Sequence, residues 1–199
     1  MQLIKLTKPI QPPFDLETAK VHTRIDQDTE DAVLEGYLAA AVDECARYMQ
    51  IAISQQDYQA RFDCWPCAML WLPMSPIVAV SAVKYLDEAG DELTLSADDW
   101  SFERRPGGGF VYFASDYSFP TLAADKLGAV RVNFTAGFDS DDGSSGDEDP
   151  ELEMPAAIRQ AVFLTFAHYY AHRESVDNGR TVPVPRGAEH LMDFHRVYR

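Results

Sequence analysis

Two closely spaced cysteines are the residues of this chain best suited to redox chemistry. Cys64-Trp65-Pro66-Cys67 has the spacing of a thioredoxin-type dithiol. That chemistry requires the first thiol at a helix N-terminus, where the helix dipole lowers its pKa. The following residues, AMLWLP, favour a strand, so the pattern predicts a turn in a hairpin connection. A thiol–disulfide oxidoreductase using Cys64 and Cys67 is kept only as an alternative function.

The other candidate chemical groups lack partners at the required spacing. His168 and His172 are four residues apart on a predicted helix and could share a metal, but no Glu of the metalloprotease type lies between them, and a third ligand would have to come from elsewhere. The acidic run Asp139–Glu153 does not match an EF-hand loop. Gly107–Gly109 precedes a strand, which argues against a phosphate-binding loop. We therefore predict no catalytic residue, no cofactor and no metal, and a protein that is not an enzyme.

The charge of the chain restricts its partners. Its 199 residues include 17 Lys and Arg against 32 Asp and Glu, a formal net charge of −15. Sequence-independent nucleic-acid binding needs basic residues that displace counterions from phosphates, so direct DNA binding is not expected. No apolar run approaches the ~20 residues of a membrane span, and three cysteines do not indicate a disulfide framework. We expect a protein of the cytosol, or of a particle assembled there, that does not bind membranes.

Helices near the start of the chain would position any binding surface. Residues 14–50 predict a short helix, a tight acidic break and a long amphipathic helix. Asp28 or Thr29 is the expected N-cap of the second helix, with Glu30 and Asp31 in its first turn. Apolar residues then recur within one arc at helical spacing, which is typical of a packing helix. They are Leu34, Tyr37, Leu38, Ala41, Cys45, Tyr48 and Met49.

The middle of the chain predicts short antiparallel strands. Apolar residues alternate with polar ones, and turn sequences stand at 87–92 (DEAGDE) and 106–109 (PGGG). Several short strands at this spacing favour an antiparallel sheet over a parallel one. The predicted strands are residues 57–62, 68–72, 77–86, 93–95, 100–103, 110–113 and 130–134.

The last third predicts two further helices. The acidic run Asp139–Glu153 reads as a solvated loop or linker. Pro155–Glu174 then forms a helix that is apolar almost all round, so it must be enclosed, and we expect neighbouring subunits to cover part of it. The tail, Pro183–Arg199, contains a short basic helix that includes His190, Phe194, Arg196 and Arg199.

These elements predict an α+β fold in which helices from both ends of the chain form the core and an antiparallel sheet is inserted between them. The expected divisions are an N-terminal helical part (1–54), a β-rich insertion (55–138), an acidic linker (139–154) and C-terminal helices that complete the core (155–199).

The order of several segments resembles the phage head–tail connector family, both its gp6-like members and the longer gp8-like conserved phage proteins. These segments are LETAKVHTRID (16–26), DAVLEGYLAAAVDECARYM (31–49), LPMSPIVAVSAVKY (72–85), TAGF (135–138) and MPAAIRQAVFLTFAHYYAHRE (154–174). The resemblance implies a structural adaptor without an active site, which forms a ring, expected to be a dodecamer. Such a ring joins the portal protein to a tail or stopper protein and lines the DNA passage. The Cys-Trp-Pro-Cys turn and the long acidic run depart from the family pattern.

The resemblance also places the protein in the virion, at the head–tail junction, and in the host cytoplasm before assembly. A phage assembly or tail-completion factor that is absent from the virion is a further alternative. Arg196 and Arg199 are candidate contacts for portal or tail. The residues expected at subunit contacts are Leu34, Leu38, Ala41, Cys45, Phe163, Phe166 and Tyr170. The oligomer number and the identity of the partners stay open.

Overall fold

The computed structural model describes residues 1–7, 14–27, 29–66, 69–138, 152–172, 176–177, 180–181 and 186–198. The chain divides into two compact units. The sheet unit comprises Met1–Ile10 and Ser54–Phe138, and the helical unit comprises Gln11–Ile53 and Asp139–Arg199. The predicted α+β class is confirmed, with the β-rich segment inserted between the helical segments. The acidic run lies outside the described residues, except for its last two.

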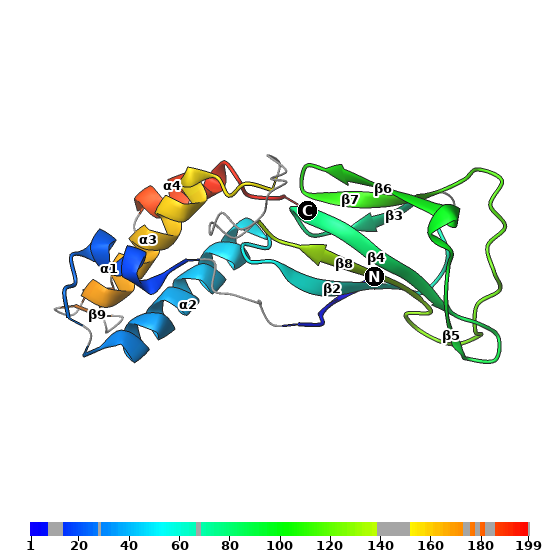
Figure 1. Ribbon diagram of the computed structural model, residues 1–199, viewed down its shortest axis with the longest axis horizontal. Coiled ribbons are helices and arrows are strands. Elements are labelled where there is room, and N and C mark those ends of the chain that lie inside the picture. Colours follow the sequence, from blue (N-terminus) through cyan, green and yellow to red (C-terminus); the bar gives the residue numbers. More distant parts are fainter. Residues whose placement is uncertain are drawn as a thin grey trace. The chain divides into compact units, whose positions relative to one another are not determined.

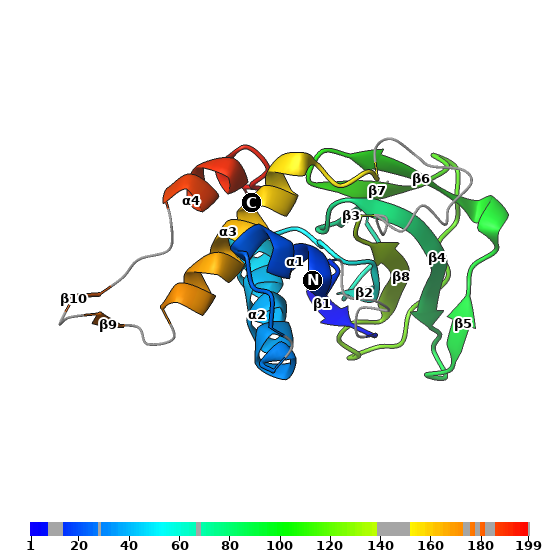
Figure 2. The same cartoon turned by 60° about the vertical axis from the view of Figure 1, so that its left-hand side comes forward.

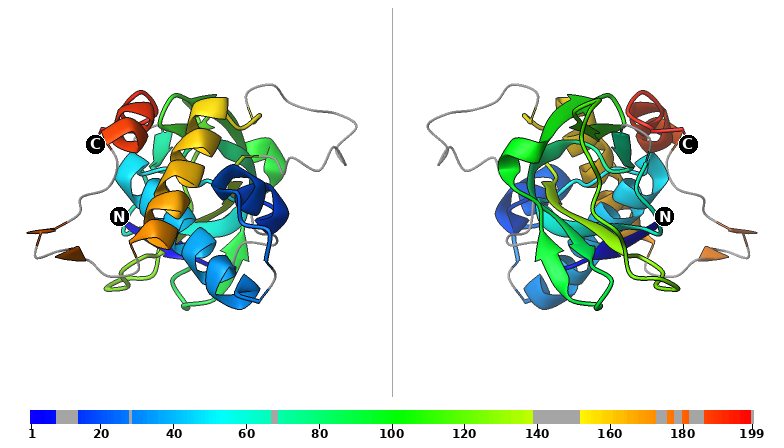
Figure 3. Two further views of the ribbon diagram at one scale, coloured as in Figure 1. Left: turned by 90° about the vertical axis from the view of Figure 1, so that its left-hand side faces the viewer. Right: turned by 90° about the vertical axis from the view of Figure 1, so that its right-hand side faces the viewer.

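The described residues of the helical unit form the helices α1 (Leu16–Thr23), α2 (Asp31–Met49), α3 (Ala156–Ala171) and α4 (Arg186–Asp193), shown in Figure 1. A strand pair, β9 (Val176–Asp177) and β10 (Arg180–Thr181), precedes α4. Helix α3 contacts each of the other three helices and lies between α1 and α4 (Figure 3, left).

The start of α2 differs from the sequence prediction. Glu30 stands at its N-cap position and makes no capping bond through its side chain, and Asp28 lies outside the described residues. Thr29 belongs to the turn before the helix, so its predicted capping role is wrong. The helix is stabilised by packing, as is usual for helices in proteins.

The core of the helical unit forms along the facing sides of α2 and α3. Helix α1 covers a further side of α3, where Phe14 and His22 place their rings 5.3 Å and 5.4 Å from that of Phe163. The apolar residues of α3 are thus enclosed largely by the chain's own helices. Buried side chains on the two main helices are Leu34, Leu38, Ala41, Cys45 and Met49 on α2, and Ile158, Ala161, Val162, Phe163, Thr165 and Phe166 on α3.

A buried ammonium group ties α1 to the beginning of α2. Lys20 is 2% exposed, and its Nζ lies 2.7 Å from Asp31 Oδ1 and 3.2 Å from Glu17 Oε1. Asp31 is in the first turn of α2, where the helix dipole also favours a negative charge. Because a buried charge is costly without a partner, this ion pair fixes the break between the helices.

The sheet unit contains two antiparallel sheets. The larger has the strand order β1-β2-β8-β4-β5 (Figure 2), and the smaller has the order β3-β7-β6. A 3₁₀ turn, Ala97–Asp99, precedes β6. The strands of the larger sheet are β1 (Gln2–Lys5), β2 (Gln56–Phe62), β8 (Val130–Ala136), β4 (Ile77–Leu86) and β5 (Glu92–Thr94), and those of the smaller are β3 (Met69–Leu72), β7 (Gly108–Phe113) and β6 (Trp100–Arg105).

The predicted turns at 87–92 and 106–109 are confirmed as the β4–β5 and β6–β7 connections. The predicted hairpin around Cys64 is wrong, because β2 and β3 belong to different sheets. Strand β1 is not among the strands that the sequence predicts. The predicted N-terminal helical part, residues 1–54, includes residues 2–5, and these pair with β2 in the larger sheet.

Side chains from both sheets form the core of the sheet unit. Tyr58 and Phe134 are partners in the β2–β8 register, and their rings stack with centroids 5.6 Å apart. Arg104 of β6 donates from Nε to the carbonyl oxygen of Ile77 in β4 at 2.6 Å, which links the two sheets. The fully buried aliphatic residues include Leu72, Ile77, Val83, Val111 and Val132.

The two ends of the inserted segment pair with each other. Strands β2 and β8 pair along their length, and Ser54 forms an isolated bridge with Phe138. Between them Gly137 has φ +137°, and a Cβ there would lie 2.4 Å from the backbone C and O atoms of Ser54. The glycine in the TAGF segment is therefore required by this close backbone approach.

We predict that Gly137→Ala lowers the free energy of unfolding by about 2–4 kcal/mol, because it combines backbone strain with a steric clash. Gly36→Ala is the matched control. Gly36 lies inside α2, where an added Cβ would meet nothing within 4 Å, so the change should raise stability by about 0.5–1 kcal/mol. Urea unfolding followed by circular dichroism measures both. Equal stability of the wild type and the Gly137→Ala variant would contradict the closure argument.

Candidate interaction surface

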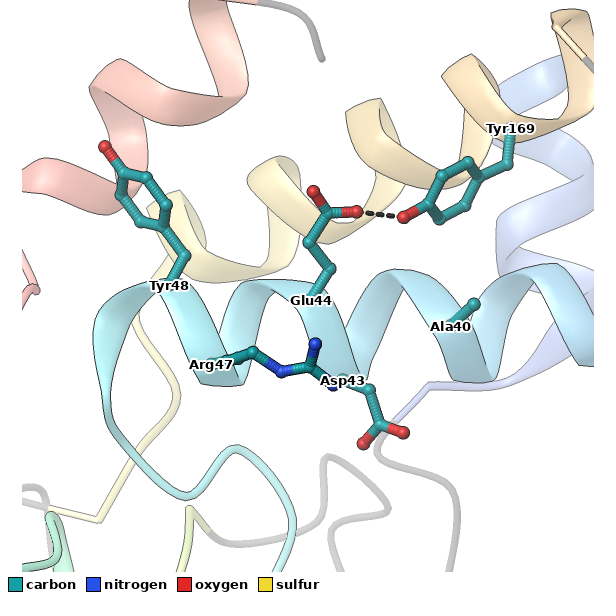
Figure 4. Close-up of a pocket in the computed structure, with 6 residues that line it drawn as sticks. All are labelled: Ala40, Asp43, Glu44, Arg47, Tyr48 and Tyr169. Atoms are coloured by element: carbon teal, nitrogen blue, oxygen red, sulfur yellow. Dashed lines mark hydrogen bonds between the residues drawn. The ribbon is translucent and has the colours of Figure 1, made fainter. Parts of the chain in front are cut away.

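An open groove runs between α2 and α3 on the surface of the helical unit. Its volume is about 510 Å³, and Figure 4 shows the residues around it. Helix α2 supplies most of the lining, and the small side chain of Ala40 leaves room between the larger neighbours. The full lining is Ala40, Asp43, Glu44, Arg47, Tyr48 and Tyr169.

A hydrogen bond crosses one end of this groove. The hydroxyl of Tyr169 on α3 donates to the Glu44 carboxylate on α2 (Figure 4). Partial burial, together with the bond to Glu44 and its negative charge, raises the pKa of Tyr169 to about 12. The phenol therefore stays protonated and remains a donor throughout the physiological pH range.

The other end of the groove is bounded by the C-terminal segment. Tyr48 donates to Asp193 Oδ1 at 2.7 Å, and the guanidinium of Arg196 lies 4.9 Å from the centroid of the Tyr48 ring, within range of a cation–π interaction. The bond to Asp193 is the main cause of a raised Tyr48 pKa. The Val197 amide donates to the carbonyl oxygen of Met49 at 2.9 Å, so the segment after α4 is attached to the end of α2.

This attachment leaves two large aromatic side chains in solvent. Phe194 and Tyr198 are 74% and 77% exposed. Helix α4 ends at Asp193, so the prediction that Phe194 and Arg196 lie on the short basic helix is wrong, although His190 does lie there. Arg196 is half-buried against Tyr48, and Arg199 lies outside the described residues.

The residues expected at subunit contacts lie in the helical unit's own core. Leu34, Leu38, Ala41, Cys45, Phe163 and Phe166 are all at most 5% exposed within one chain. Buried to this degree, they offer almost no surface to a second subunit. Tyr170 is half-buried and lines a second hollow, of about 320 Å³, at the end of α1.

Cys45 has the environment of an unreactive thiol. Its Sγ lies 3.7 Å from Thr165 Oγ1, and Thr165 in turn donates to the carbonyl oxygen of Ala161 at 2.9 Å. Burial raises the pKa of the Cys45 thiol to about 11, so the nucleophilic thiolate is not formed near neutral pH.

The tryptophan of the Cys-Trp-Pro-Cys motif is a packing residue. Cys64 is exposed, and Cys67 lies outside the described residues. Trp65 donates from Nε1 to the carbonyl oxygen of Pro120 at 2.9 Å, and its ring lies among three aromatic rings 5.1–5.9 Å away. The strand β3 follows the motif, so the helix N-terminus that lowers a thiol pKa in redox proteins is not formed after Cys64. The rings around Trp65 are Tyr85, Phe113 and Phe119.

The histidine pair on α3 makes a local contact. His168 and His172 have ring centroids 4.7 Å apart, and His172 Nδ1 lies 3.2 Å from the carbonyl oxygen of His168. Across the part of the chain that the structure describes, three or more His, Cys, Asp or Glu side chains are nowhere grouped so as to hold a metal ion.

Comparisons with known proteins bear on what these surfaces are for. A family model described as phage gp6-like head–tail connector protein matches residues 14–83, which include α1, α2, β2, β3 and most of β4. Chains of three solved structures are similar over 100% of this chain and 97% of theirs. The likeness to the gp6-like head–tail connector family thus rests on residues 14–83 of this chain.

Two of these similar chains are 25% identical to this chain: one in the neck of an empty gene transfer agent (GTA) particle computed with C6 symmetry, TM-score 0.78, and one in the virion of a native GTA particle, TM-score 0.77. The third, in the neck of a native GTA particle computed with C12 symmetry, is 24% identical with a TM-score of 0.75. No curated protein sequence matches this chain. None of the helices among its described residues has the length and apolar character needed to cross a membrane.

We predict that Cys64 and Cys45 differ strongly in reactivity. In a Cys67→Ser background at pH 8, exposed Cys64 should react with a maleimide within minutes, and Cys45 only after denaturation. Mass spectrometry of the labelled peptides measures this. Rapid labelling of Cys45 in the native protein would contradict the assignment.

The raised pKa of Cys45 also makes stability depend on pH. Because the Cys45 pKa is raised on folding, its contribution to the free energy of unfolding is complete below about pH 9 and is lost as the pH rises towards 11.

Proposed function

We propose that the connector forms a ring in the neck of a phage-like particle, where it joins the portal to a tail or stopper protein and lines the DNA passage. The observation that carries the proposal is the likeness to chains of GTA particles, which covers 100% of this chain and 97% of each of those chains. Two of those necks were computed with C6 and C12 symmetry, which supports a ring and, for the second, a dodecamer.

The net charge fits this role. A chain with formal charge −15 repels the phosphate backbone, so DNA can pass a ring of such chains without being retained. Lys and Arg, which would hold the backbone, are outnumbered by Asp and Glu almost two to one.

The C-terminal segment supports a contact with portal or tail. Its exposed aromatic side chains, Phe194 and Tyr198, flank Arg196, and aromatic and Arg side chains are enriched at protein interfaces. The attachment of Val197 to Met49 holds the segment in place before binding, which reduces the entropy lost on association. Arg196 and Arg199 remain candidate contacts within this segment.

The two alternative functions are a thiol–disulfide oxidoreductase and an assembly factor that is absent from the virion. The redox alternative gains no support, since Cys64 lies in a link between two sheets and Trp65 of the same motif is a packing residue. An assembly factor outside the virion would share this fold, so only the composition of mature particles distinguishes it from a neck component.

The direct test is native mass spectrometry of the connector alone and mixed with a portal protein from the same genome, together with cryo-electron microscopy of particles. We expect a ring whose subunit number matches the portal, and density for the connector at the neck. Mature particles without the connector would overturn the proposal in favour of an assembly factor.

We predict that a Phe194→Ser, Tyr198→Ser variant keeps its fold, because both side chains are largely in solvent, but binds portal or tail protein at least tenfold more weakly. Leu127→Ser is the matched control, since Leu127 is 86% exposed in the sheet unit. Affinity can be measured by biolayer interferometry, and unchanged affinity of the double variant for both partners would remove the C-terminal segment from the interface.

A further inference from the structure

Helices α1 and α4 contact the α2–α3 pair from opposite sides of α3 (Figure 3, left). On the first side α1 packs across the pair, with Phe14 and His22 against Phe163. On the other side lies the open groove, whose Tyr48 end is bounded by α4 and the C-terminal segment (Figure 4). The described residues of the helical unit therefore present α1 on one side and an open groove on the other.

The groove continues towards the start of α2 as an apolar surface. Val33 and Tyr37 precede Ala40 by seven and three residues, so they lie on the same side of the helix. Val33 is 47% exposed, Ala40 is exposed and Tyr37 is half-exposed. Apolar residues at this spacing beside a groove are typical of helix-in-groove recognition.

The outer face of α1 has the matching character. Val21 is 78% exposed at the centre of that face. The Glu17 side chain is 71% exposed one turn before it, and Arg24 follows the helix in an exposed position. An apolar residue is thus flanked by a negative charge on one end and a positive charge on the other.

We propose that α1 of a second copy of this chain occupies the α2–α3 groove. This rests on the proposed ring and names its subunit contact. Val21 would cover the apolar floor formed by Val33 and Ala40. Arg24 would approach the carboxylates of Asp43 and Glu44.

The placement of the two surfaces suits a closed ring. A head-to-tail interface uses two different surfaces of each subunit, and it closes into a ring when the rotation between subunits allows. Helix α1 and the groove lie on opposite sides of one compact unit, so each copy can offer its α1 to the next and receive α1 from the previous one. The pairing of Arg24 with the carboxylates of Asp43 and Glu44 would set the register of the contact.

The test is cross-linking of assembled connector between Val21→Cys and Ala40→Cys, in a chain that also carries Cys64→Ser and Cys67→Ser so that Cys45, which is buried, is the remaining native cysteine. A short bis-maleimide is added to purified particles, or to rings formed with portal, and the products are separated on a denaturing gel. We expect a ladder from dimer to the full ring. Val21→Cys with Leu127→Cys is the control pair and should remain monomeric on the gel.

The outcomes separate this inference from the proposed function. Rings or particles that contain the cysteine variant and give no ladder would overturn the contact and leave the ring intact. If native mass spectrometry and particles show no oligomer of the wild-type connector, both proposals fail.

A charge exchange gives a second readout that does not depend on added cysteines. Arg24→Glu should lower ring yield at least fivefold, and Arg24→Glu combined with Asp43→Arg should restore most of it. Both positions are exposed, so the single variants should unfold at the same urea concentration as the wild type. Loss of rings with no recovery in the double variant would contradict the pairing.

Discussion

The pairing of β2 with β8 is the constraint on which the rest of this structure depends. These strands are the first and last full strands of the inserted segment, and their register, from Gln56 with Ala136 to Phe62 with Val130, brings its two ends together. Helices α2 and α3 are separated by more than a hundred residues, yet they can pack as neighbours because the segment between them starts and finishes at one place. The cost of closing so long a loop grows only slowly with its length, and the extensive β2–β8 ladder offsets it.

The consequence for the helical unit is that its core is made of segments that are distant in sequence. Cys45 contacts Thr165, and Phe14 contacts Phe163, so each half of the chain covers the apolar face of the other. This is why α3 can be apolar on nearly every side without a neighbouring subunit against most of its surface. Assembly then has to use what the core leaves outside, namely the groove, the outer face of α1 and the C-terminal aromatic residues.

Sequence patterns within single elements predict the structure of those elements, but they do not predict contacts between residues that are distant in the sequence. The run Ile77–Leu86 and the glycines of the β6–β7 turn determine their own conformation, and both were predicted correctly. The split into two sheets depends on contacts such as that of Arg104 with Ile77, which no local pattern reveals. From the sequence alone Lys20 would be expected at the surface, because its burial depends on the ion pair with Asp31. Because the core positions of α2 and α3 follow helical periodicity, the sequence found them readily, but periodicity does not distinguish a subunit's core from its interface.

The net charge of this chain limits how copies of it can associate. Chains of formal charge −15 repel one another at long range, and at physiological ionic strength that repulsion is screened beyond about 8 Å. Association must therefore be driven by apolar contact at short range, with the few basic side chains placed where they meet carboxylates. Arg47 in the groove and Arg24 after α1 are basic residues at the two surfaces in question. In the proposed head-to-tail contact, Arg24 of one copy meets the carboxylates of Asp43 and Glu44 of the next at every interface.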